Sequence, residues 1–99
     1  MKSIPPLIRI DKERFQIHVD GREINLSTIQ FDIFVMICEA DGKVVSRDQM
    51  ITKVWRCNPK LKIQHRTIDQ HISRIRKTVG KKLPVIRTVR DRGYSLIRH

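Results

Sequence analysis

Apolar side chains recur along residues 66–79 with the period of an α-helix. Four of them stand at i, i+4, i+7 and i+11 and therefore share one narrow stripe of a helical wheel. They are Ile68, Ile72, Ile75 and Val79. The positions between them are polar or charged. The pattern predicts an amphipathic helix whose stripe packs against a core while its other faces meet solvent.

Two earlier helices are predicted from Ser-x-x-Gln patterns, in which both side chains satisfy free N–H groups at a helix start. The pairs are Ser27 with Gln30 and Ser46 with Gln49. They predict helices over roughly 27–40 and 46–56, the first ended by Asp41-Gly42. The apolar positions assigned to the core are Phe31, Phe34, Val35, Cys38, Met50, Val54 and, at the end of the second helix, Trp55.

Thr67 and Gln70 form a third pattern of this kind, inside the 66–79 segment. With Thr67 as the capping residue, the helix would begin just after it. The alternative is a start at His65 or Arg66, with Thr67 facing solvent.

Short β-rich segments predict two small antiparallel sheets. Residues 7–10, 15–19 and 22–24 read as a meander, with a type I′ turn at Asp20-Gly21. Residues 83–97 read as two strands joined by Asp91-Arg92-Gly93, where the glycine can take a positive φ. The predicted fold is α+β, a winged helix-turn-helix with an N-terminal antiparallel β-meander, three helices and a C-terminal β-hairpin wing.

The length of 99 residues fits one domain, which we expect over residues 7–99 after a linker stub or disordered lead-in at residues 1–6. That lead-in is too short and too polar for a signal peptide or a transmembrane span, so we expect a soluble, cytoplasmic protein with no membrane partner. Cys38 and Cys57 lack the spacing of a zinc site. We therefore interpret both cysteines as ordinary reduced thiols.

Positive charge is concentrated in the second half of the chain. Residues 1–52 carry seven Lys and Arg against eight Asp and Glu, whereas residues 53–99 carry fourteen against two. The formal net charge of +11 therefore divides as −1 and +12. The excess lies on the predicted third helix and the hairpin, which favours a polyanionic partner such as nucleic acid.

The third helix turns hydrogen-bonding side chains away from its apolar stripe. They are Arg66, Gln70, Ser73, Arg74 and Lys77, flanked by Thr67 and His71 on one side and by Asp69 and Arg76 on the other. Arginine can fork onto a guanine edge and glutamine can pair with adenine, so this face could read bases. A solvated basic face is the alternative. Arg90 and Arg92 flank the hairpin tip, where they could reach the minor groove or its phosphates.

The segments HRTIDQHISRIRK and IRTVRDRGYSL, with DGREINLSTIQFDIF and DGKVVSRDQMITKVW before them, resemble the OmpR/PhoB-type DNA-binding domain of bacterial response regulators. The resemblance covers nearly the whole chain. It implies a transcriptional regulator of double-stranded DNA, with the third helix in the major groove. The family's base and phosphate contacts would fall on Arg66, Thr67, His71, Ser73, Arg74 and Arg76, with wing contacts on Thr88 and Arg90.

Two aromatic residues have competing interpretations. Trp55 corresponds to a family aromatic whose ring nitrogen can meet a phosphate, and a core aromatic is the alternative. Tyr94 is expected to pack the hairpin against the third helix rather than contact DNA. The wing tip also departs from the family, which more often has glycine where Asp91 stands.

The resemblance implies further partners. The segment of Lys60, Leu61 and Lys62 corresponds to the loop through which the family touches RNA polymerase. A receiver domain precedes this domain in the family, and whether one precedes it here stays open. One recognition helix reads few base pairs, so we expect a monomer that is paired on tandem direct repeats or through such a receiver.

Other functions have little support in the sequence. No GxxxxGK, nucleophile elbow or HExxH is present, and Asp69 and Asp91 make no plausible acid–base pair, so we expect no enzyme and no cofactor. His65 and His71 lie six residues apart and do not share a helix face as metal ligands would. A winged helix that binds structured RNA or a protein is the alternative function.

Overall fold

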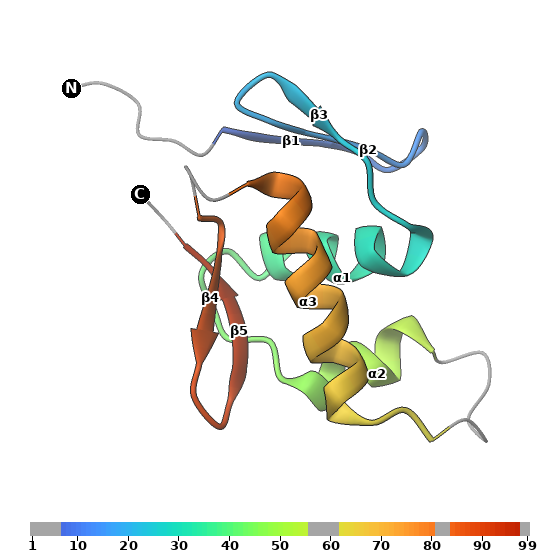
Figure 1. The fold of residues 1–99 in the computed structure, drawn as a ribbon, viewed down its shortest axis with the longest axis vertical. Helices are drawn as coiled ribbons and strands as arrows, with labels where there is room; N and C mark the ends of the chain where they lie inside the picture. The colour runs from blue at the N-terminus through green and yellow to red at the C-terminus, as the bar shows by residue number, and fades with distance from the viewer. Residues whose placement is uncertain (1–6, 56–61, 81–83, 98–99) are drawn as a thin grey trace.

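A computed structural model describes residues 7–55, 62–80 and 84–97. Its three-stranded sheet comprises β1 (Ile8–Asp11), β2 (Gln16–Val19) and β3 (Arg22–Ile24). The helices are α1 (Thr28–Glu39), α2 (Arg47–Val54) and α3 (His65–Val79), and the hairpin is β4 (Ile86–Val89) with β5 (Gly93–Leu96). Figure 1 shows the hairpin on one side of α3 and α2 on the other, with α1 behind α3 and the three-stranded sheet near its C-terminal end. The predicted winged helix-turn-helix is confirmed.

The N-terminal meander pairs β1 with β2 and β2 with β3, both antiparallel. Asp20 and Gly21 take φ values of 52° and 80°, the left-handed pair that a type I′ turn needs. Alternate residues of the sheet, Ile17, Val19 and Ile24, are buried. The meander therefore covers one side of the helical core, as its alternation predicts.

Both predicted capping boxes are present at α1 and α2, with Ser27 and Ser46 as the capping residues. The helix ends fall one or two residues inside the predicted limits. Cys38 is only half-buried, whereas Ile33 and Ile37 are completely buried. Helix α1 lies in the middle of the fold and is buried over more than one face, which an amphipathic pattern does not reveal.

Helix α3 begins at His65, so the capping box predicted at Thr67 is wrong. Gln64 is the capping residue, without a side-chain bond, and the Thr67 N–H donates to the Gln64 carbonyl at 3.0 Å. The earlier helix start is therefore correct. The apolar stripe is confirmed, since its three isoleucines are completely buried and Val79 is nearly so. Within residues 7–55, 62–80 and 84–97, no helix is long and apolar enough to cross a membrane.

Strand β5 is held on both sides. It pairs with β4, and Tyr94 also exchanges backbone hydrogen bonds of 2.8 and 3.0 Å with Val45, in the link between α1 and α2. This approach leaves no room for a side chain at Gly93, where a Cβ would lie 2.1 Å from the Val45 carbonyl oxygen. Gly93 has φ of 144°, and Asp91 also takes a positive φ, 62°. The wing is thus attached to the helical scaffold through its second strand.

Candidate nucleic-acid interface

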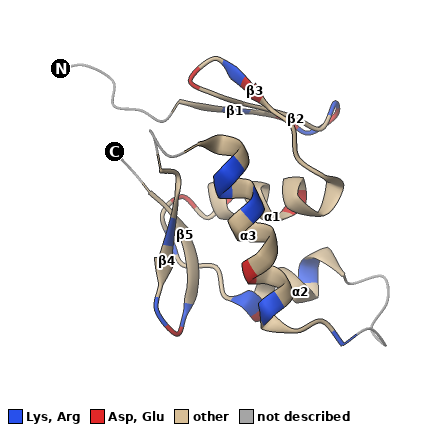
Figure 2. Cartoon of the chain, viewed as in Figure 1, with Lys and Arg blue, Asp and Glu red and all other residues tan. Residues whose placement is uncertain are grey.

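The face of α3 opposite the buried stripe is open to solvent. All five outward residues of the prediction are exposed: Arg66, Gln70, Ser73, Arg74 and Lys77. Figure 2 shows Lys and Arg along this helix and on both sides of the hairpin turn. Burial of the isoleucine stripe fixes which way α3 faces, so the polar side is presented outward by core packing. The free donors of this face suit both base edges and phosphates.

The wing tip carries the second group of exposed cations. Arg90 and Arg92 are exposed on either side of Asp91, which is exposed as well. Thr88 lies on the neighbouring strand β4 and is also exposed. The two predicted wing arginines are therefore accessible to a ligand, with one carboxylate between them.

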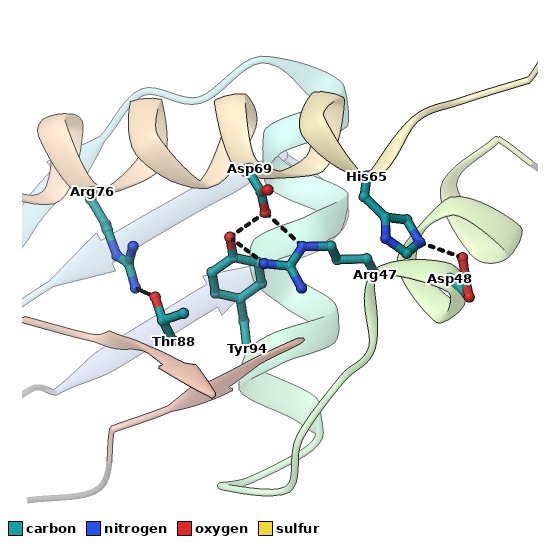
Figure 3. Close-up of polar contacts among 7 residues, drawn as sticks. All are labelled: Arg47, Asp48, His65, Asp69, Arg76, Thr88 and Tyr94. Atoms are coloured by element: carbon teal, nitrogen blue, oxygen red, sulfur yellow. Dashed lines mark hydrogen bonds and ion pairs between the residues drawn. The ribbon is translucent and has the colours of Figure 1, made fainter. Parts of the chain in front are cut away.

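Arg76 differs from the other arginines among the predicted contacts because its side chain is already bound within the protein. Its guanidinium donates to the Ile86 carbonyl oxygen at 3.0 Å. It also donates to the Thr88 hydroxyl at 2.8 Å (Figure 3). Its guanidinium also lies 5.6 Å from the centre of the Tyr94 ring. Arg76 joins α3 to β4 in this structure, and a DNA contact by Arg76 or Thr88 stays a prediction.

Tyr94 is 4% exposed and packs the wing against α3, as expected for a structural residue. Its hydroxyl donates to Asp69 Oδ1, and Arg47 Nε donates to the same oxygen at 2.7 Å (Figure 3). The Arg47 guanidinium lies 5.1 Å from the ring centre. The Arg47–Asp69–Tyr94 cluster joins α2, α3 and β5. No local sequence pattern indicates this cluster.

Asp69 is ionised in this cluster. Burial opposes its charge, but the hydrogen bonds from Tyr94 and Arg47 hold the pKa of Asp69 below its usual range. Burial and the neighbouring carboxylate raise the pKa of Tyr94. The hydrogen bond to Asp69 raises the pKa of Arg47. The cluster is therefore a charge-assisted set of hydrogen bonds, which are stronger than neutral ones.

His71 and Trp55 lie together on the other flank of α3. Their ring centres are 6.2 Å apart, and His71 Nδ1 is 3.4 Å from Gln30 Nε2. Trp55 is half-buried against the core at the end of α2, so its ring takes part in packing and keeps an exposed side. Burial, with a smaller effect of Arg74, lowers the pKa of His71. The His71 ring is therefore neutral near pH 7, at the edge of the cationic face of α3.

Two further polar contacts hold the ends of α3. Arg22, on β3, donates to the Val79 carbonyl oxygen at the C-terminal end of the helix. At the other end, His65 and Asp48 form a 2.7 Å pair in which both side chains are exposed. These contacts tie α3 to the meander and to α2.

The loop residues Lys60 and Leu61 and the thiol of Cys57 lie outside the described residues. Lys62 is described and exposed. Burial raises the pKa of the Cys38 thiol to about 12, which keeps it protonated.

Comparison with known proteins identifies the family. Residues 21–96 match the family described as "Transcriptional regulatory protein, C terminal". The chain belongs to this family. It is the family of OmpR/PhoB-type DNA-binding domains that the sequence motifs resemble, a family of transcription-factor domains and not of enzymes.

Individual relatives agree with this membership. The phosphate regulon regulatory protein PhoB of Rhizobium meliloti (strain 1021) is 36% identical over 91 residues, which cover 90% of this chain and 39% of the relative. The DNA-binding domain of Klebsiella pneumoniae RstA, solved in complex with the RstA box, is 28% identical with a TM-score of 0.77, over 99% of this chain and 97% of that one. Thermotoga maritima DrrB, an OmpR/PhoB homologue, is 26% identical with a TM-score of 0.77, over 96% of this chain and 43% of that one. The chain spans about two fifths of the length of the curated relatives it matches.

Proposed function

We propose that this domain recognises specific sites on double-stranded DNA, with α3 in the major groove and the β4–β5 wing at the minor groove. The observation that carries the proposal is the exposed polar face of α3, directly opposite a completely buried stripe. The face is about three turns long and rich in arginine, which fits a B-form major groove. As a regulator of this family, the protein would act in the cytoplasm.

The proposed contact residues fall into candidates for base reading and other proposed DNA contacts. Gln70 and Arg74 lie four residues apart on the exposed face and are the best candidates for base reading, with Ser73 beside them. The other proposed contacts are Trp55, Arg66, Thr67, His71, Arg76 and Lys77 from the helices, and Thr88, Arg90 and Arg92 from the wing. Exposure supports the arginines at 66, 90 and 92 most directly, because none of their side chains is buried.

Filter binding with matched duplexes tests this proposal against RNA recognition. The parent domain should retain duplex DNA and bind duplex RNA of the same sequence weakly, because the A-form major groove is too narrow for α3. Equal or tighter retention of the RNA duplex would contradict the proposal. Arg74→Ala serves as a control, since it should weaken DNA retention while leaving the core untouched.

On this proposal, two copies act together on tandem direct repeats. One helix of about three turns contacts too few base pairs for a useful specificity ratio, so a second copy is needed. The apolar stripe of α3 is used in the core and gives no surface for a stable dimer. The domain alone is therefore monomeric, and pairing comes from the DNA or from a receiver domain.

RNA polymerase is the second proposed partner, through Lys60, Leu61 and Lys62. Family resemblance and the exposure of Lys62 support it. Alanine substitutions there should leave operator affinity nearly intact while transcription falls. If affinity and transcription fall in parallel, the loop is a DNA contact instead.

A further inference from the structure

The wing and the recognition helix are joined by polar contacts on two sides of one buried ring. On one side, the Tyr94 hydroxyl from β5 donates to Asp69 on α3. On the other, Arg76 of α3 donates to the Ile86 carbonyl oxygen and the Thr88 hydroxyl on β4. Each strand of the hairpin therefore has its own link to α3 (Figure 3).

The Tyr94 ring lies between two guanidinium groups, 5.1 Å from Arg47 and 5.6 Å from Arg76. Two positive charges beside one ring repel each other unless an anion balances them, and Asp69 is the carboxylate bonded to Arg47. Among the residues that the structure describes, α3 has no other acidic side chain. Asp69 therefore carries the negative charge of this helix, and it joins α3 to α2 through Arg47 and to β5 through Tyr94.

We propose that the Tyr94 hydroxyl and Asp69 act as positioning groups that fix the angle of the wing to α3, so that Arg90 meets the DNA backbone while α3 occupies the major groove. This inference rests on the proposed function. A duplex presents its grooves at fixed spacing, and a wing set at the correct angle before binding loses less conformational entropy on contact. Neither group needs to touch DNA to affect affinity.

Tyr94→Phe is the first test, because it removes one hydroxyl and changes no charge. The probe is a duplex selected from a random pool by the parent domain. The variant should lose about threefold to tenfold in affinity, the range that one hydrogen bond allows. Its log–log salt dependence should flatten by about one unit, as Arg90→Ala should also do, because the same phosphate contact is lost.

A double-mutant cycle separates positioning from general destabilisation. In an Arg90→Ala background, Tyr94→Phe should reduce affinity by less than about twofold, because the contact that it positions is already absent. Ile17→Val is the matched control. It thins the core under the distant meander, so it should lower the thermal midpoint without changing the salt dependence in either background.

A pair of substitutions at Asp69 tests independently whether the oxygen that accepts from Tyr94 is needed. Asp69→Asn and Asp69→Ala both remove the charge, but only asparagine keeps an oxygen that accepts from Tyr94. The alanine variant should show the flattened salt dependence, and the asparagine variant should keep the parental slope.

The inference would be overturned by additive losses for Tyr94→Phe and Arg90→Ala, or by an unchanged salt dependence in Tyr94→Phe. An Arg90→Ala variant that binds DNA with the affinity of the parent would overturn it as well, because the wing would then make no phosphate contact that needs positioning. Failure of the proposed function is distinguishable, because the parent itself would then select no duplex.

Discussion

The Tyr94 hydroxyl donates to a carboxylate oxygen of Asp69, 25 positions earlier in the chain. Arg47 donates to the same oxygen from 22 positions before Asp69. A single oxygen thus joins three elements that the chain brings together only on folding. Since Asp69 has a depressed pKa in the folded state, this contact links stability to pH.

Asp69→Asn should lower the free energy of unfolding by about 1 kcal/mol at pH 7, a value that allows for the partial exposure of the carboxylate. Because the folded pKa lies below the unfolded value of about 3.9, the contribution of the charge is complete above that pH and is lost as pH falls through the folded pKa. Urea unfolding at pH 7, 5 and 3 measures it. If the difference in free energy of unfolding between parent and variant is the same at pH 3 and pH 7, the charge of Asp69 has no role in stability.

Gly93→Ala should destabilise the domain by at least about 2 kcal/mol, because the new Cβ meets the Val45 carbonyl oxygen in a backbone conformation that alanine disfavours. Gly21→Ala is the matched control. Gly21 also has a positive φ, but nothing lies within 4 Å of its Cβ position, so only about 1 kcal/mol should be lost. Thermal unfolding of both variants measures the difference. Equal losses would mean that the approach of β5 to the α1–α2 link does not constrain the wing.

His71 should make DNA binding depend on pH. Its pKa lies below the ordinary value in the free domain, so the ring is mostly neutral at pH 7.5, and a nearby phosphate would favour its protonation. Affinity should therefore rise as pH falls from 8 to 6, by about twofold to fivefold. The folded domain itself should be less stable over the same change, because protonation of a group with a lowered folded pKa opposes folding.

Affinity titrations of His71→Gln and His18→Gln at pH 8 and 6 measure this effect. His18 alternates in β2 with the buried Ile17 and Val19, so it lies on the face of the sheet opposite the core, and its replacement should keep the parental gain. A His71→Gln domain whose affinity changes with pH as the parent's does would remove His71 from the phosphate contacts.

Local spacing was sufficient to predict most of the fold. The isoleucine stripe of α3 lies within four turns of one helix, and each capping box spans four residues, so each signal is complete within a short segment. The same stripe determined which residues of α3 are exposed, because the outward face is what remains once the inward face is assigned.

Contacts between distant residues could not be predicted in this way. Arg22 and Val79 lie 57 positions apart. No local pattern indicates that the Arg22 side chain donates to the last carbonyl group of α3. The cluster around Asp69 is similar, since an acidic residue on the flank of a basic helix reads as an ordinary exposed charge. The prediction at Thr67 was wrong because its Thr-x-x-Gln sequence begins within the first turn of α3, a helix that starts at His65 without a side-chain cap.

On the proposal that the domain alone is monomeric, pairing it artificially should raise its affinity for direct repeats. Fusion to an unrelated dimeriser through a flexible linker should tighten binding to two half-sites one helical turn apart by at least about tenfold, because the second binding event becomes intramolecular. Binding to a single half-site should change far less. Sedimentation of the unfused 99 residues as a stable dimer, or equal affinity for one and two half-sites, would contradict the expected monomer.

On the proposed function, α3 reads base edges in the major groove, and Arg74 is the residue on which this reading depends most. Arg74→Ala should fold normally, because the side chain is exposed opposite the buried stripe. It should lose about 1–3 kcal/mol of discrimination at one or two base pairs, since a forked guanine contact is the commonest specific readout.

Selection from a random duplex pool, carried out in parallel with the parent and Arg74→Ala, measures this directly. We expect the parental site to contain a guanine whose enrichment disappears in the variant while the other positions stay enriched. If Arg74→Ala selects the same sequence as the parent, with the same enrichment at every position, α3 does not read bases through Arg74.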